Sequence, residues 1–274
     1  MSKDSLYQSI LKKKSFLCVG LDTALDKMPQ HLLSLEDPVF EFNKTIVDHT
    51  QDLVVAYKPN TAFYEALGPS GMISLQKTIE YIPDDILVIA DAKRGDIGNT
   101  SKMYAQAFFS HYKADALTVA PYMGHDSVRP FLEFDNKWVI ILGLTSNSGS
   151  QDFQHLSIQD GSSLHLEVIK KCAEYGTPDN TMFVIGATQA EHIRTIRQLV
   201  PDHFFLVPGV GAQGGSLEAV VSSGMNSSVG LLVNSSRGII YASQDTDYGK
   251  AARVKAENLQ REMAYYLKEA GHLT

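Results

Sequence analysis

Eight short apolar runs recur along the chain of 274 residues, and this repetition constrains the fold more than any other feature. Each run is almost continuously hydrophobic, which is typical of strands in a parallel sheet that is buried on both faces. The runs are FLCVGLD (16–22), LVVAYKPN (53–60), ILVIADAK (86–93), ALTVAP (116–121), WVIILGLTSN (138–147), MFVIGAT (182–188), FFLVPGVGAQ (204–213) and VGLLVNSSR (229–237).

Helical patterns separate most of these runs. Asp37 and Pro38 suit the N-cap and first turn of a helix, and the segment 247–270 is rich in Ala, Glu, Lys and Leu, which predicts a closing helix. Strands that alternate with helices predict a parallel sheet, and eight such units favour one closed (β/α)8 TIM barrel. We therefore expect an α/β protein with a single domain over residues 1–274. An open doubly wound sheet is the alternative, but no GxGxxG follows the first run.

Composition and charge exclude several classes of protein. The net charge of −7 argues against a nucleic-acid-binding surface. No run approaches the roughly 18 apolar residues of a membrane span, and KKKSFLCVGL is too short in its apolar part to be a signal peptide. Cys18 and Cys172 lie far apart, and the histidines form no HExxH motif, so neither a redox motif nor a metal site is indicated. We expect a reduced, cytoplasmic protein.

Polar residues stand at the carboxyl ends of the predicted strands. In a TIM barrel the active site lies at these ends, because the carboxyl ends of all eight strands meet on one face. The residues found there are Asp22, Lys58, Asn60, Asp91, Lys93, Ser146, Asn147, Gln213 and Arg237.

The stretch DAKRGDIGNT (91–100) ends the third run. Since side chains alternate along a strand, Asp91 and Lys93 share one face. The glycines after them permit sharp turns, so Asp96 can swing back or reach toward a neighbour, and Lys58 ends the adjacent strand. The result is an alternating Lys-Asp-Lys-Asp array, which is either a structural ion-pair network or a catalytic one. Each aspartate keeps its lysine protonated, and a charged proton donor beside fixed negative charge suits a reaction that forms and then protonates a carbanion.

Two glycine-containing loops are candidates for a phosphate site. In many barrels phosphate binds to the loops after strands seven and eight, which here carry PGVGAQGG and NSSRG. Backbone N–H groups, Gln213 and the Arg237 guanidinium are suitable donors to an anion, although two turns with one surface arginine would look the same. The polar segment after the fifth run (148–161) is either a surface insertion or a lid.

At this point the sequence resembles a known family. DAKRGDIGNT, with AYKPN before it and TSN after it, looks like the signature of orotidine 5′-phosphate decarboxylase, and the likeness is closest to the longer bacterial branch. It extends from Asp22 to Arg237, while the Asp-x-Lys-x-x-Asp core alone is shared with sugar-phosphate decarboxylases and aldolases on the same barrel. One departure is Ser148, which stands where many relatives have proline.

The resemblance implies an activity. The family converts orotidine 5′-monophosphate to uridine 5′-monophosphate, the last step of de novo pyrimidine synthesis, without a cofactor or metal. Carried over, Lys93 would donate a proton to C6 of the pyrimidine and Asp91 would lie near the departing carboxylate, in a charged network with Lys58 and Asp96.

The resemblance also implies a homodimer with shared active sites and a set of binding residues. Asp96 and Thr100 would cross into the site of the partner subunit. The other implied contacts are Asp22 and Lys58 to the ribose hydroxyls, Ser146 to the pyrimidine amide, and Gln213 and Arg237 to the phosphate, with Asn60 as a further candidate.

Two other functions fit parts of the pattern. A related barrel acting on a sugar phosphate through an enediolate would need a metal ion, and Lys58 and the TSN segment oppose it. A nucleotide-binding barrel without catalysis would bind tightly without turnover, and the complete charged array opposes that.

Overall fold

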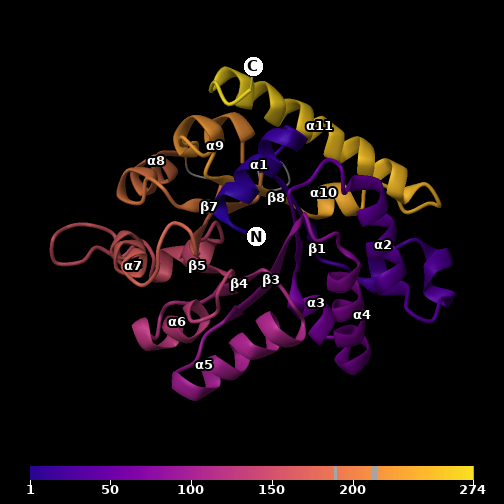
Figure 1. Ribbon diagram of the computed structural model, residues 1–274, viewed down its shortest axis with the longest axis horizontal. Helices are drawn as coiled ribbons and strands as arrows, with labels where there is room; N and C mark the ends of the chain where they lie inside the picture. Colours follow the sequence, from indigo (N-terminus) through magenta and orange to yellow (C-terminus); the bar gives the residue numbers. More distant parts are fainter. Residues whose placement is uncertain (188–189, 211–214, 274) are drawn as a thin grey trace.

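A closed barrel of eight parallel strands forms the centre of the molecule in the computed structural model, which describes residues 1–187, 190–210 and 215–273 (Figure 1). Each strand pairs with the next strand in the chain, and β8 returns to pair with β1. The strands are β1 (Leu17–Leu21), β2 (Ala56–Pro59), β3 (Leu87–Arg94), β4 (Ala116–Val119), β5 (Trp138–Leu144), β6 (Thr181–Ile185), β7 (Phe204–Pro208) and β8 (Leu231–Ser235). The predicted (β/α)8 barrel is confirmed.

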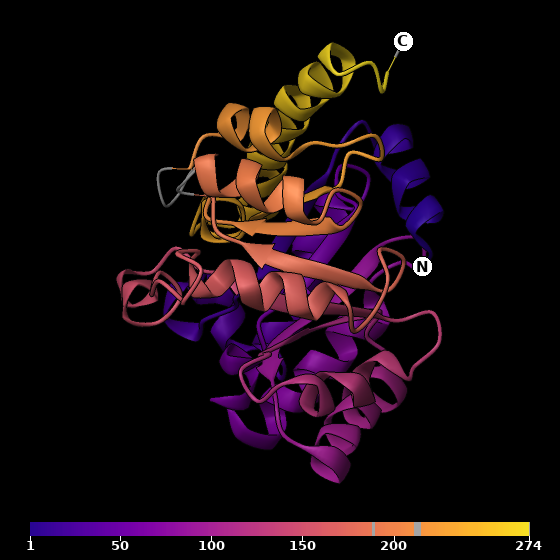
Figure 2. The same cartoon turned by 90° about the vertical axis from the view of Figure 1, so that its left-hand side faces the viewer.

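Helices lie outside the strands and bury them (Figures 1 and 2). The helices are α1 (Lys3–Lys13), α2 (Pro38–Thr50), α3 (Thr61–Glu65), α4 (Gly68–Tyr81), α5 (Gly98–Ala105), α6 (His125–Leu132), α7 (Leu164–Ala173), α8 (Ala190–Leu199), α9 (Leu217–Gly224), α10 (Arg237–Ile240) and α11 (Tyr248–Glu269). Short 3-10 helices η1 (Leu25–Lys27), η2 (Gln30–Ser34) and η4 (Ser148–Asp152) and a π-helical segment η3 (Gln106–His111) complete the chain. None of the helices in the described residues is long and apolar enough to cross a membrane.

Helix α2 begins as its sequence predicts. The Asp37 carboxylate accepts a hydrogen bond from the backbone N–H of Phe40 at 3.1 Å, and Pro38 occupies the first turn. Val39 and Phe42 are buried on the face of the helix toward the barrel. The N-cap satisfies an N–H group that has no partner within the helix, which contributes about 1 kcal/mol.

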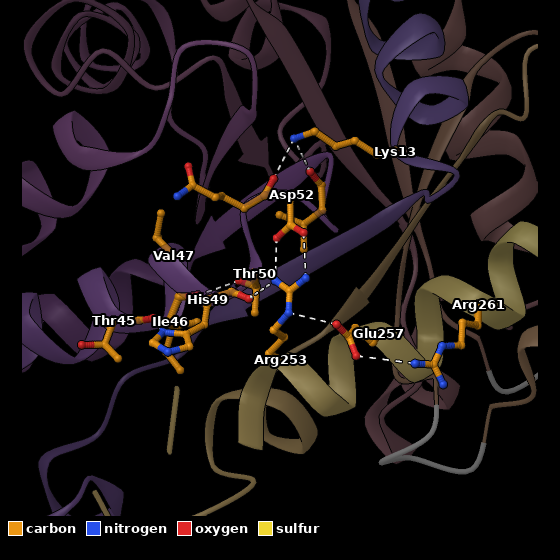
Figure 3. A network of polar contacts seen from close by, with 12 residues as sticks. Lys13, Thr45, Ile46, Val47, His49, Thr50, Asp52, Arg253, Glu257 and Arg261 are labelled. Carbon is orange, nitrogen blue, oxygen red and sulfur yellow. Dashed lines mark hydrogen bonds and ion pairs between the residues drawn. The ribbon is translucent and has the colours of Figure 1, made fainter. Parts of the chain in front are cut away.

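The closing helix α11 is held to the rest of the molecule by a charged network (Figure 3). The Arg253 guanidinium donates to both carboxylate oxygens of Asp52 at 2.8 Å, and it pairs with Glu257 one turn further along at 2.9 Å. Lys13 donates to the carbonyl oxygens of Gln51 and Val54 nearby. The C-terminal helix is therefore fixed to the chain after α2, at the end of the barrel where β2 begins.

Except for β3, the strands are shorter than the apolar runs that predicted them. Strand β5 ends at Leu144, so the polar residues after it lie in a turn rather than in the sheet, and β7 ends at Pro208. A chain that leaves the barrel turns outward as soon as the strand ladder ends, whereas the hydrophobic pattern continues into the turn. The short connection between β4 and β5 does contain a helix, α6, even though Pro130 lies inside it.

Candidate active site

A cavity of about 480 Å³ opens at the carboxyl ends of the strands, where the sequence predicted the site. Its walls combine apolar side chains of β5, β6 and β7 with charged side chains of β2 and β3 and polar side chains of the turn after β5. The lining residues are Lys58, Asp91, Lys93, Leu142, Thr145, Ser146, Asn147, Val184, Leu206 and Pro208.

Asp91 lies between two lysines at this cavity. Its Oδ2 atom accepts a hydrogen bond from Lys58 Nζ at 2.7 Å, and its Oδ1 atom accepts one from Lys93 Nζ at 2.6 Å. Lys58 Nζ is also 4.0 Å from Asp22 Oδ1. The side chains of Asp91 and Lys58 are only 10% and 6% exposed, whereas Lys93 is 48% exposed. The structure thus brings four predicted residues together and leaves one ammonium group accessible.

Burial and charge act in opposite directions on this cluster. Burial raises the pKa of the Asp91 carboxyl, but the positive charges of Lys58 and Lys93 outweigh it and hold that pKa well below its usual range. Burial lowers the pKa of Lys58, but Asp91 and Asp22 outweigh it and keep that pKa above its usual value. Asp91 is therefore a carboxylate and Lys58 an ammonium at neutral pH, so neither is a free general base.

Thr118 of β4 fixes the geometry of Asp91 and Lys93. Its hydroxyl donates to Asp91 Oδ1 at 3.0 Å and accepts from the backbone N–H of Lys93 at 2.9 Å. Lys93 has a left-handed backbone with φ of 46°, and the pairing of β3 with β4 shifts register between Ala90 and Arg94. Sequence reasoning missed Thr118, because one hydroxyl in an otherwise apolar strand is not distinctive without knowledge of its neighbours.

Asp96 and Thr100 lie outside this cluster. The Asp96 carboxylate accepts from the backbone N–H of Ile97 at 2.8 Å, and Thr100 is exposed in the first turn of α5. Within the residues that the structure describes, no ion pair joins Asp96 to a lysine. One chain therefore brings together the Lys58–Asp91–Lys93 part of the predicted array, with Asp22 beside it, and not the fourth member.

The remaining predicted residues are placed differently. Ser146 lies in the turn after β5 and lines the cavity. Asn60 caps α3, where its side-chain oxygen accepts from the Ala62 N–H at 3.3 Å, and it does not line the cavity. Arg237 is exposed at the start of α10, after β8. Gln213 lies outside the described residues.

Comparison with known proteins agrees with this geometry. The sequence model of the orotidine 5'-phosphate decarboxylase / HUMPS family matches residues 15–252. Proteins named orotidine 5'-phosphate decarboxylase from Parabacteroides distasonis and Flavobacterium johnsoniae are 56% and 58% identical to the chain. These alignments cover 99% and 96% of this chain and 98% and 97% of the relatives. The solved OMP decarboxylase of Leishmania donovani superposes with a TM-score of 0.82 at 35% identity, over 97% of this chain and 100% of that one. The chain belongs to the orotidine 5'-phosphate decarboxylase / HUMPS family.

Proposed function

We propose that this protein decarboxylates orotidine 5′-monophosphate to uridine 5′-monophosphate, without a metal or cofactor, and that Lys93 supplies the proton. Relatives that carry the decarboxylase name align with 99% and 96% of this chain. The observation that carries the mechanism is the buried Asp91 carboxylate between two lysines. Its oxygens lie 2.7 Å from Lys58 Nζ and 2.6 Å from the accessible Lys93 Nζ. This arrangement offers a charged proton donor in a cavity that has apolar walls.

The reaction breaks the bond between C6 of the pyrimidine and its carboxylate carbon. The bonding electron pair stays on C6, CO₂ leaves, and the Lys93 ammonium then transfers one proton to C6. Lys93 regains its proton from water, so the net change is the replacement of the carboxylate by hydrogen. Attraction between the ammonium and C6 grows as negative charge develops there, and only an interaction that grows in this way lowers the barrier.

Asp91 contributes in two ways in this proposal. It accepts a hydrogen bond from Lys93 Nζ and so orients that side chain, and it lies near the carboxylate that departs. The Lys58 ammonium balances part of its charge in the ground state. Repulsion between Asp91 and the substrate carboxylate would favour departure of CO₂, and the nearby lysines limit what that repulsion costs in binding.

The other predicted residues bind the rest of the nucleotide in this proposal. Asp22 and Lys58 hold the ribose hydroxyls, since they lie together beside Asp91. Ser146 meets the pyrimidine amide from the turn after β5. The contacts proposed for the remaining substrate groups are Gln213 and Arg237 to the phosphate and Asn60 as a further polar contact.

We also propose that the active enzyme is a homodimer with shared sites. The Asp96 carboxylate accepts a hydrogen bond from the Ile97 N–H and lies outside the cluster of its own chain, and β3 and β4 end side by side, with Ala120 donating to the Arg94 carbonyl at 2.8 Å. The turns and helix that follow these two strands expose large apolar side chains, a common feature of subunit interfaces. These are Ile97, Met103, Tyr122 and Met123.

A mixing experiment tests the shared site. Asp96→Asn and Lys93→Ala homodimers should each be inactive, and mixed dimers should regain activity because one of their two sites contains both native residues. Size-exclusion chromatography with two different tags would verify the mixed species. Absence of recovery in verified mixed dimers would mean that each chain builds its own site.

Finally, we propose a cytoplasmic location, since both cysteines are free thiols in buried positions.

The activity itself is tested by incubating the protein with orotidine 5′-monophosphate and a chelator and following the absorbance of the orotate chromophore. Loss of this absorbance with formation of uridine 5′-monophosphate is expected. Turnover that stops with the chelator and returns with Mg²⁺ would favour metal-dependent chemistry instead.

A further inference from the structure

In the polar segment between β5 and α7, the side chain of Gln154 is hydrogen-bonded to the active-site turn. In Figure 1 this segment extends outward from the barrel beside α7. The Gln154 side-chain oxygen accepts from the backbone N–H of Thr145 at 2.8 Å, and its amide nitrogen donates to the Thr145 hydroxyl at 2.9 Å. Two hydrogen bonds thus join Gln154 to the residue directly before Ser146.

Helix α7 in turn fixes the backbone of Gln154. The Gln154 carbonyl oxygen accepts a hydrogen bond from the backbone N–H of His165 at 3.0 Å and lies 2.8 Å from His165 Nδ1. His165 is buried, and its ring packs in a cluster with those of His155 and His192, whose centroids lie 5.3 and 5.4 Å from its own. Gln154 is therefore presented to Thr145 from a packed and hydrogen-bonded base, which lowers the entropy cost of its two side-chain bonds.

Ser146 is confined on its other side as well. A Cβ atom at Gly186 would lie 3.0 Å from the backbone nitrogen of Ser146 and 3.1 Å from its hydroxyl oxygen, so the turn packs directly on this glycine. The N–H of Gly186 donates to the carbonyl of Leu144 at 2.8 Å. The turn that carries Ser146 thus packs on Gly186, directly after β6, and is also hydrogen-bonded through Thr145 to the Gln154 side chain.

We propose that Gln154 is a positioning residue for recognition of the pyrimidine base. It acts through Thr145 on Ser146, and residues 148–163 serve as a fixed brace for that turn. The inference rests on the proposed function, because it needs Ser146 to meet the base. Gln154 does not line the cavity and touches no substrate in this arrangement.

The consequence is a selective one. Gln154→Ala leaves the Thr145 N–H without its partner and removes the bond from Gln154 to the Thr145 hydroxyl, which keeps only its bond to Asn147, so the turn relaxes and Ser146 loses its fixed place. Affinity for uridine 5′-monophosphate should fall roughly tenfold, the scale of one to two hydrogen bonds. Affinity for ribose 5-phosphate, which has no base, should stay within about twofold of the wild-type value.

Calorimetric titration of both ligands into each variant tests this. Gln151→Ala is the matched control, since Gln151 is an exposed glutamine on the same segment, and it should bind both ligands like the wild type. Gln154→Glu keeps the acceptor for the Thr145 N–H and should fall between wild type and Gln154→Ala. Equal losses of both ligands in Gln154→Ala, or losses no larger than in Gln151→Ala, would overturn the proposal.

A second variant covers the case in which Gln154→Ala does not fold. Thr145→Val keeps the backbone N–H bond to Gln154 and removes the hydroxyl, with its bonds to Gln154 and to Asn147. It should show part of the same selective loss, whereas unchanged binding of both ligands would overturn the proposal. Measuring turnover of the wild-type protein distinguishes a failure of the proposed function from a failure of the positioning role of Gln154. A wild-type protein that binds uridine 5′-monophosphate but does not decarboxylate orotidine 5′-monophosphate would refute the proposed function. Active wild-type protein with a non-selective Gln154→Ala would refute only the positioning role.

Discussion

Replacing Thr118 with valine removes a hydroxyl while keeping the shape of the side chain. This one hydroxyl donates to Asp91 Oδ1 at 3.0 Å and accepts from the Lys93 N–H at 2.9 Å, and Thr118 is fully buried. A hydrogen bond to a charged group is worth about 1.5–3 kcal/mol, and a buried N–H without a partner costs about 1–3 kcal/mol. Burial of the added methyl group offsets about 1 kcal/mol. We expect Thr118→Val to lower the free energy of unfolding by about 2–4 kcal/mol.

The same substitution should reduce turnover. Lys93 adopts a left-handed backbone, which costs about 1 kcal/mol for a residue with a side chain, and the Thr118 hydroxyl helps to hold it there. Without this bond the Lys93 backbone relaxes and its ammonium moves relative to C6. A displacement of about 1 Å at a reacting group can cost about 100-fold in rate. We therefore expect kcat to fall by roughly 10- to 100-fold.

Thr118→Ser is the control, because serine keeps the hydroxyl and loses only a buried methyl group. It should lose about 1 kcal/mol of stability and keep turnover within about threefold. Urea unfolding, followed by the fluorescence of the single tryptophan Trp138, measures the stability, and loss of orotate absorbance measures turnover. If the valine variant were as active as the serine variant, the hydroxyl would not position Lys93.

Two further predictions concern other parts of the molecule. If the Arg237 guanidinium binds the phosphate, Arg237→Ala should lower kcat/KM for orotidine 5′-monophosphate by an amount equivalent to about 2–4 kcal/mol in the activation free energy. The same substitution should hardly affect the very slow turnover of the phosphate-free nucleoside. Equal fractional losses on both substrates would mean that Arg237 does not contact the phosphate. Burial lowers the pKa of His203 to about 4, with Lys3 and Arg197 adding to the effect. The folded protein therefore favours the neutral His203 ring. The stability that this ring contributes is complete above the unfolded pKa of about 6.5 and is lost as the pH falls toward 4. Between pH 7 and 4, urea unfolding should show a loss of roughly 2 kcal/mol more in the wild type than in His203→Leu, and parallel pH curves would contradict this assignment.

The barrel could be predicted from the sequence because its information is local. Each buried parallel strand needs a nearly continuous apolar run, and all eight runs are present. The same rule places polar residues at one face of the barrel, which is why Lys58, Asp91 and Lys93 were expected together and are found within hydrogen-bonding distance. The ends of the strands were less predictable, since apolar residues continue into the turns.

Contacts that depend on the three-dimensional arrangement were not predictable. The left-handed backbone of Lys93 and its bond to Thr118 arise from a register shift between two strands, and no local pattern encodes such a shift. The hydrogen bonds of Gln154 depend on how a long polar segment folds back onto Thr145. The position of Asp96 in an assembled dimer depends on a second chain. It remains a prediction, as do the roles of Gln213 and Arg237 at the phosphate.

The most direct test of the central claim is to compare turnover with product binding in Lys93→Ala. Asp91 would keep its bond to Lys58, so the rest of the cavity should be preserved. We predict that the variant loses nearly all decarboxylation of orotidine 5′-monophosphate and still binds uridine 5′-monophosphate with an affinity close to that of the wild type. Turnover within tenfold of wild type, a change of only about 1.4 kcal/mol in the barrier, would contradict the role of Lys93 as the proton donor.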